Sequence, residues 1–109
     1  MSVYMYQASY SAAAIKALIA KPEDRSAVVR AVIEANGGTM IGAWMSFGEN
    51  DVVIIAEMPN DESMAAVAMA VAATGAIVGG KSTQLLSMDQ AVNAMTKAQA
   101  VARTYSPPG

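Results

Sequence analysis

The hydrophobic pattern is clearest between Gly38 and Pro59, where it predicts a β-hairpin. Residues 39–47 and 52–58 are rich in apolar and β-forming residues, and the turn-forming segment 48–51 separates them. Successive side chains of a strand point to opposite faces, so both faces of this hairpin are mostly apolar and we expect both to be covered. Strict alternation places Thr39, Ile41, Ala43, Met45 and Phe47 on one face and Met40, Gly42, Trp44 and Ser46 on the other.

The segments around the hairpin alternate between strand and helix patterns. Helix-capping side chains are available at Ser9 or Ser11, at Asn60 or Asp61, and in the Ser87–Gln90 capping box. On the second predicted helix the valines and Ile33 form an apolar stripe, with Arg25 on the outward side. The predicted elements are strand 3–8, helices 12–20 and 22–36, strands 39–47 and 52–58, helix 64–73, strand 76–87 and helix 88–103.

This order of elements predicts an α+β fold of the ferredoxin-like type, β-α-β-β-α-β with an extra C-terminal helix. Such a chain forms a four-stranded antiparallel sheet with helices on one face only. The second, apolar face is then left for a partner subunit, in an association of the dimeric α+β barrel type, or for a ligand. We expect one domain over residues 1–103 and a flexible tail over residues 104–109.

The amino-acid composition limits the classes of function that the chain can have. The 109 residues suffice for one domain, and 54% of them are hydrophobic while only 15% are charged, which favours a homo-oligomer. The absence of cysteine and histidine and a net charge of −2 give no support for a metal site, a cofactor or a nucleic-acid partner. The start of the chain lacks signal-peptide features, and the Ala-rich segment 63–80 is too weakly apolar for a membrane span, so we expect a cytoplasmic protein.

Three segments together resemble the GYD domain family of small bacterial proteins, over residues 4 to about 95. They are RAVIEANGG at 30–38, FGENDVVIIAEMPNDE at 47–62 and ATGAI at 73–77. Gly48 and Asp51 match the motif that names the family, whereas Asn50 stands where its tyrosine is expected. The resemblance implies a ferredoxin-like domain that associates through its sheet, and it brings no established reaction.

Four residues are candidates for a ligand site: Tyr4, Tyr6, Trp44 and Glu57. Glu57 lies in an otherwise apolar strand on the face of Val53 and Ile55, and it is the weak candidate for a catalytic base. The alternative, which the sequence favours, is a strand-end carboxylate that reaches solvent or a basic partner. The aromatic residues could line a pocket, although packing in a core or subunit interface is the commoner role of such residues.

Three functions agree with these features. The first is a homo-oligomeric binding or assembly module that holds a small apolar or aromatic ligand against the open sheet face. The second is a cofactor-free enzyme of the oxygenase or isomerase type that acts on such a molecule, with Glu57 as base. The third is a sensor of small metabolites. The sequence favours the first.

Overall fold

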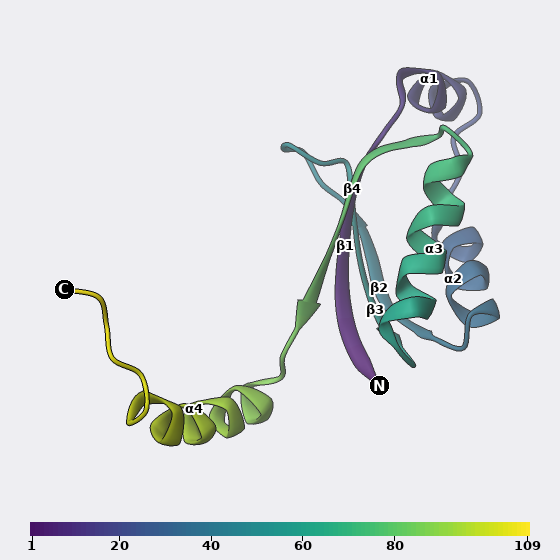
Figure 1. Ribbon diagram of the computed structural model, residues 1–109. Coiled ribbons are helices and arrows are strands. Elements are labelled where there is room, and N and C mark those ends of the chain that lie inside the picture. The colour runs from purple at the N-terminus through teal and green to yellow at the C-terminus, as the bar shows by residue number, and fades with distance from the viewer.

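The computed structural model describes residues 1–109 and contains a four-stranded antiparallel sheet in the order β2-β3-β1-β4 (Figure 1). This order is that of a ferredoxin-like sheet, so the predicted α+β fold is confirmed. The elements are β1 (Ser2–Tyr10), α1 (Ala12–Ala20), α2 (Ser26–Ala35), β2 (Thr39–Met45), β3 (Val52–Met58), α3 (Asp61–Ala73), β4 (Ile77–Leu85) and α4 (Met88–Ala102).

Helices α2 and α3 cover one face of the sheet, and α1 lies at one end of it (Figure 1). Apolar side chains hold the two helices on this face, because α2 buries Ile33 and α3 buries Met64 and Val67 against the sheet. These helices pack on the even-numbered positions of β1 and β3, where alternation gathers the apolar side chains. The buried core comprises Tyr4, Tyr6, Ala8, Ile33, Met40, Ile54, Ala56, Met58, Met64 and Val67.

Most predicted helix starts are confirmed by side-chain caps. Ser11 caps α1, Asn60 caps α3, and Ser87 and Gln90 form the predicted reciprocal capping box at α4. The exception is α2, which begins at Ser26, whereas the sequence predicted a start between Pro22 and Asp24. The carboxylate of Asp24 accepts a hydrogen bond of 2.8 Å from the Ser26 backbone N–H, a local contact that competes with helix formation at residues 24–26.

The face assignment predicted for β2 is wrong at its beginning. Met40 pairs with Ala56 and Gly42 pairs with Ile55, so the register shifts between these positions as in a β-bulge. Met40 therefore joins Ala43 and Met45 on the helix side of the sheet, since their partners Ala56, Ile54 and Val52 point that way. Trp44, opposite Val53, lies on the other face.

Gly37 and Gly38 end α2 and fix its distance from the hairpin. Gly37 adopts a φ of +82°, in the left-handed region that glycine tolerates best. A Cβ atom at Gly38 would lie 2.7 Å from the Glu57 carbonyl oxygen and 3.0 Å from a methyl carbon of Ile33. The missing side chain therefore lets the end of α2 approach β3.

The C-terminal helix α4 extends away from the rest of the chain, on the side of the sheet opposite α2 and α3 (Figure 1). None of its residues is buried. The radius of gyration is 17.7 Å, whereas a compact domain of this length has about 13 Å. The open face of the sheet and α4 thus share one side of the molecule. No helix has the length and apolar character needed to cross a bilayer.

Candidate functional site

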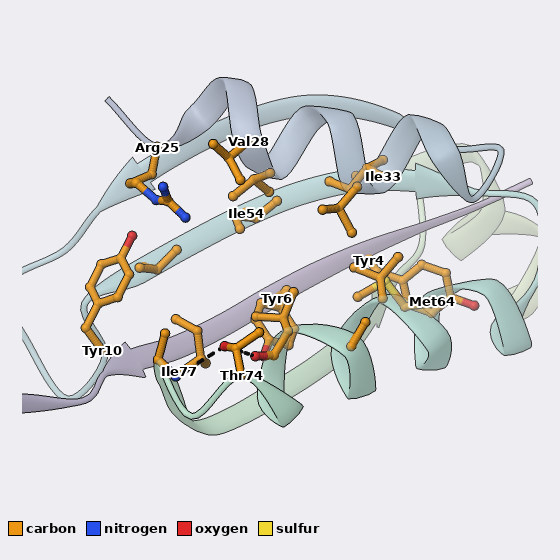
Figure 2. A pocket seen from close by; sticks show the side chains of 18 residues that line it. Tyr4, Tyr6, Tyr10, Arg25, Val28, Ile33, Ile54, Met64, Thr74 and Ile77 are labelled. Atoms are coloured by element: carbon orange, nitrogen blue, oxygen red, sulfur yellow. Dashed lines mark hydrogen bonds between the residues drawn. The ribbon is translucent and has the colours of Figure 1, made fainter. Parts of the chain in front are cut away.

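A cavity of about 240 Å³ lies between helices α2 and α3 and the sheet (Figure 2). Its floor consists of Tyr4, Tyr6, Ile54 and Ala56, whose side chains point toward the helices from β1 and β3. Sixteen of its 18 lining residues are hydrophobic. The walls come from α2 through Val28, Val29, Val32 and Ile33, and from α3 through Met64, Val67, Ala70 and Val71.

The strand register brings the floor residues together. Tyr4 lies opposite Ala56 and Tyr6 lies opposite Ile54 in the antiparallel pairing of β1 with β3. Alternation then turns all four side chains to the same face. Small residues at Ala56 and Ala70 leave space that larger aliphatic side chains would fill, so the helices cover the sheet without filling the volume beneath them.

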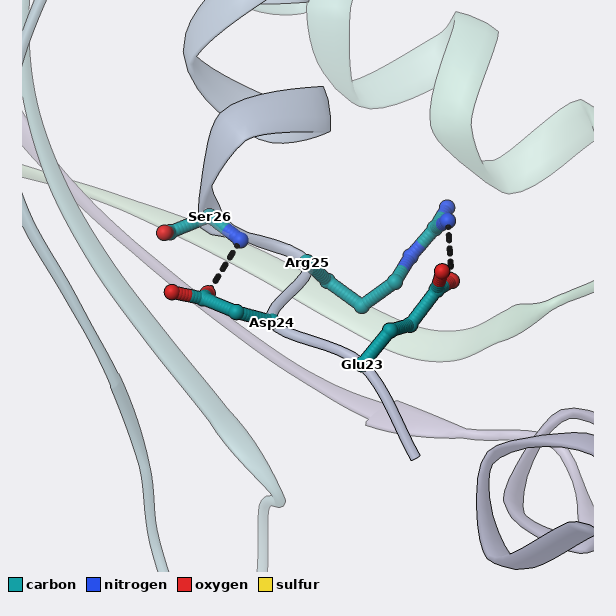
Figure 3. Close-up of polar contacts among 4 residues, drawn as sticks. All are labelled: Glu23, Asp24, Arg25 and Ser26. Carbon is teal, nitrogen blue, oxygen red and sulfur yellow. Dashed lines mark hydrogen bonds and ion pairs between the residues drawn. The ribbon is translucent and has the colours of Figure 1, made fainter. Parts of the chain in front are cut away.

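Polar groups gather at one end of the cavity, where Tyr10 and Arg25 lie (Figure 2). The backbone N–H of Tyr10 donates a hydrogen bond of 3.0 Å to the Asp51 carboxylate, which holds the end of β1. Arg25 forms an ion pair of 2.8 Å with Glu23 through one terminal nitrogen, beside the Asp24–Ser26 contact at the start of α2 (Figure 3). The other N–H groups of the guanidinium remain available to a ligand.

The opposite end of the cavity lies at Tyr4 and Met64 (Figure 2). The Tyr4 hydroxyl donates a hydrogen bond to the carboxylate of Asp61, the first residue of α3. This hydrogen bond is the main cause that raises the pKa of Tyr4, followed by burial. Burial also raises the pKa values of Tyr6 and Tyr10. All three phenols are therefore neutral at pH 7.

A second cavity of about 200 Å³ adjoins the polar end of the first. The two share Tyr10, Arg25, Val29, Val52 and Ile54. Trp44 contributes to the second cavity, but the residue is 57% exposed and its ring lies over Gly42 on the open face of the sheet. The two cavities therefore meet at the Tyr10–Arg25 end.

The predicted ligand residues divide into two groups. Tyr4 and Tyr6 lie side by side on the floor of the larger cavity. Glu57 lies opposite Val3 on the other face of the sheet, and it lines neither of the two cavities. Trp44 shares that open face and pairs with Val53, four residues from Glu57 along β3, or about 13 Å at the rise of a strand. The four residues do not form one site.

Sequence reasoning missed the polar end of the cavity. The predicted outward position of Arg25 assumed a helix that begins near Pro22. Because α2 begins at Ser26, Arg25 precedes the helix and its side chain lies at the cavity. Tyr10 continues the row of Tyr4 and Tyr6, and this extension of the strand was the available signal. No three acidic side chains gather closely enough to hold a metal ion.

The sheet order and the two covering helices define a ferredoxin-like α+β domain with an apolar cavity beneath the helices. The chain belongs to the GYD domain family, because the family model of that domain matches residues 4–95. Among solved structures, the chain is similar to one titled "crystal structure of FFRP-DM1", with 13% identity and a TM-score of 0.49 over 79% of this chain and 100% of that one. None of the curated proteins compared with the chain matches it.

Proposed function

We propose that this GYD domain is a homo-oligomeric binding module that holds a small apolar or aromatic molecule in the cavity between α2, α3 and the sheet. The observation that carries the proposal is the lining of this cavity, hydrophobic except at the Arg25 end and at Thr74. Ligand pockets are mostly apolar, with a few polar groups that fix orientation. The proposed ligand site thus lies on the sheet face that α2 and α3 cover. The sequence pattern had favoured the open face.

The size of the cavity supports a small ligand. An apolar cavity of about 150 Å³ stays dry and binds benzene. At about 240 Å³, this cavity has room for a two-ring aromatic molecule or a short branched alkyl group. The favourable free energy of binding would come from apolar surface removed from water, at about 25 cal/mol per Å².

The open face of the sheet supports the homo-oligomeric part of the proposal. Its odd-numbered positions on β1 and β3 include Val3, Met5, Val53 and Ile55, and no element of the chain covers them (Figure 1). An antiparallel sheet that faces water on one side usually carries polar residues there. We propose that a second copy covers this face, in a protein of the cytoplasm.

The test is a titration of the full chain with 2-naphthol, followed by calorimetry. Val67→Phe places a large side chain in the cavity and is expected to weaken binding at least tenfold. Ala66→Phe makes a comparable change on the exposed side of the same helix and should bind like the unaltered chain. Ala70→Phe, at the cavity wall, is a second blocking variant if Val67→Phe folds poorly. Equal affinities in all variants, or no binding by the unaltered chain, would contradict the proposed site.

A further inference from the structure

Helix α4 has an apolar stripe that nothing in the chain covers. Met88, Val92 and Met95 follow one another at intervals of four and three residues and therefore lie on one side of the helix. Ala91 and Ala98 continue the stripe, whereas Asn93 and Lys97 lie on the opposite side. Met88 is 84% exposed and Met95 is 65% exposed.

A helix of this kind needs a packing partner. It has 15 residues, and isolated helices of about 12–15 residues are marginal in water because nucleation is costly. Helices in proteins obtain most of their stability from the packing of an apolar face. The capping box of Ser87 and Gln90 stabilises the first turn, but it leaves the stripe exposed.

The chain as a whole exposes more surface than a monomer should. Its accessible surface is 7574 Å² at a mass of 11.2 kDa. A folded monomer of that mass exposes about 5,700 Å². The excess of roughly 1,900 Å² is more than the ~800 Å² that each partner contributes to a standard interface. The excess is large enough to supply one protomer's share of an interface.

We propose that α4 is an exchanged arm whose apolar stripe packs against the body of a second copy of this chain. The inference rests on the homo-oligomeric part of the proposed function and names the segment that completes the interface. The open sheet face and α4 lie on the same side of the molecule (Figure 1). A second copy seated on the sheet would therefore lie beside α4 and could cover its stripe.

The short connection between β4 and α4 favours a second copy, and not the chain's own sheet, as the packing partner of α4. Only Leu86 and Ser87 separate the end of β4 from the start of α4. Ser87 has the extended backbone of a helix N-cap, with φ of −66° and ψ of 162°. A return of α4 onto its own sheet would need the chain to reverse its direction within these two connecting residues.

The test uses a photo-crosslinking residue in the full chain. p-Benzoylphenylalanine in place of Met95 is illuminated at a concentration at which sedimentation shows an oligomer. The matched control carries the same residue in place of Asn93, on the opposite side of α4. We expect a covalent product of twice the chain mass, at least fivefold more abundant from position 95 than from position 93.

A second pair of variants measures the contribution of the stripe to assembly. The Val92→Lys and Met95→Lys substitutions together should raise the dissociation constant of the oligomer at least tenfold. Asn93→Lys together with Ala100→Lys adds the same charge on the opposite side of α4 and should leave the constant unchanged. An oligomer that gives only intrachain cross-links, or whose dissociation constant does not change when the stripe is altered, would contradict the proposed arm. The proposed assembly through the sheet would not be affected by that result. A monomer in every variant would overturn both.

Discussion

The hydroxyl of Tyr4 on β1 donates a hydrogen bond to the carboxylate of Asp61, 57 residues later in the chain, at the first position of α3. The bond joins the floor of the cavity to the helix that forms one of its walls. It also gives the Tyr4 phenol a raised pKa, because a neighbouring carboxylate disfavours the phenolate. The position of α3 is therefore linked to the protonation of a tyrosine.

This linkage predicts a loss of stability at alkaline pH. The folded-state pKa of Tyr4 is raised, so the unfolded chain ionises first. The stabilisation is fully present below about pH 10 and is lost as pH rises through the folded-state pKa. The urea midpoint of the unaltered chain should fall as the pH rises above about 10, and it should fall less steeply in Tyr4→Phe.

Asp61→Asn is the control for this effect. The amide retains an acceptor oxygen but removes the negative charge, so the pKa of Tyr4 should move back toward its ordinary value. The pH dependence should then lie between those of the unaltered chain and Tyr4→Phe, since burial still raises the pKa of Tyr4 when the charge of Asp61 is removed. Identical slopes in all three proteins would show that the Tyr4–Asp61 contact does not bear on stability.

Gly38→Ala should destabilise the fold. The added Cβ would press on the Glu57 carbonyl oxygen and on Ile33, and backbone atoms cannot move aside easily. Overpacking of this kind costs about 1–3 kcal/mol. Gly48→Ala is the matched control, because a Cβ added there would meet no atom within 4 Å, and it should change stability by less than about 0.5 kcal/mol. Denaturation by urea measures both, and equal midpoints would contradict the close approach of α2 and β3.

Arg25 should favour ligands with an acidic group at the polar end of the cavity. 2-Naphthoate should bind more tightly than 2-naphthol, which has a similar aromatic body and no charge at neutral pH. Arg25 already pairs with Glu23 and is partly exposed, so the gain is limited to about 1 kcal/mol, or roughly fivefold in affinity. Arg25→Gln should abolish the difference, whereas Arg30→Gln, on α2 outside the cavity lining, should preserve it. If Arg25→Gln still bound 2-naphthoate more tightly than 2-naphthol, the carboxylate of the ligand would have to lie away from Arg25.

Trp44 is the single tryptophan and reports on the open sheet face. Its 57% exposure predicts an emission spectrum typical of a solvated indole in the separate chain. Association through this face should bury the ring and shift the emission to shorter wavelengths as protein concentration rises. An oligomer whose Trp44 emission does not change with concentration would have to form through another surface.

The sequence predicted the features that depend on local patterns. Ser11, Asn60 and the Ser87–Gln90 pair act as caps because capping involves residues within one turn. The order of strands and helices followed from periodicity and chain connectivity, which also identified the fold.

Features that depend on contacts between distant segments could not be predicted. The bulge between Met40 and Gly42 is defined by pairing with β3, and strict alternation along β2 therefore failed there. The cavity depends on how far α2 and α3 stand above Tyr4 and Tyr6, a distance that no local pattern encodes. The start of α2 at Ser26, two to four residues later than predicted, was enough to place Arg25 before the helix and at the end of the cavity.

The most direct test of the central claim is native mass spectrometry of the purified full chain at several concentrations. The proposed function predicts an oligomer that carries an additional small mass, and Val67→Phe should lose this mass while it keeps the oligomer. A chain that stays monomeric at micromolar concentration, with no additional mass and no affinity for 2-naphthol, would contradict both the assembly and the ligand site.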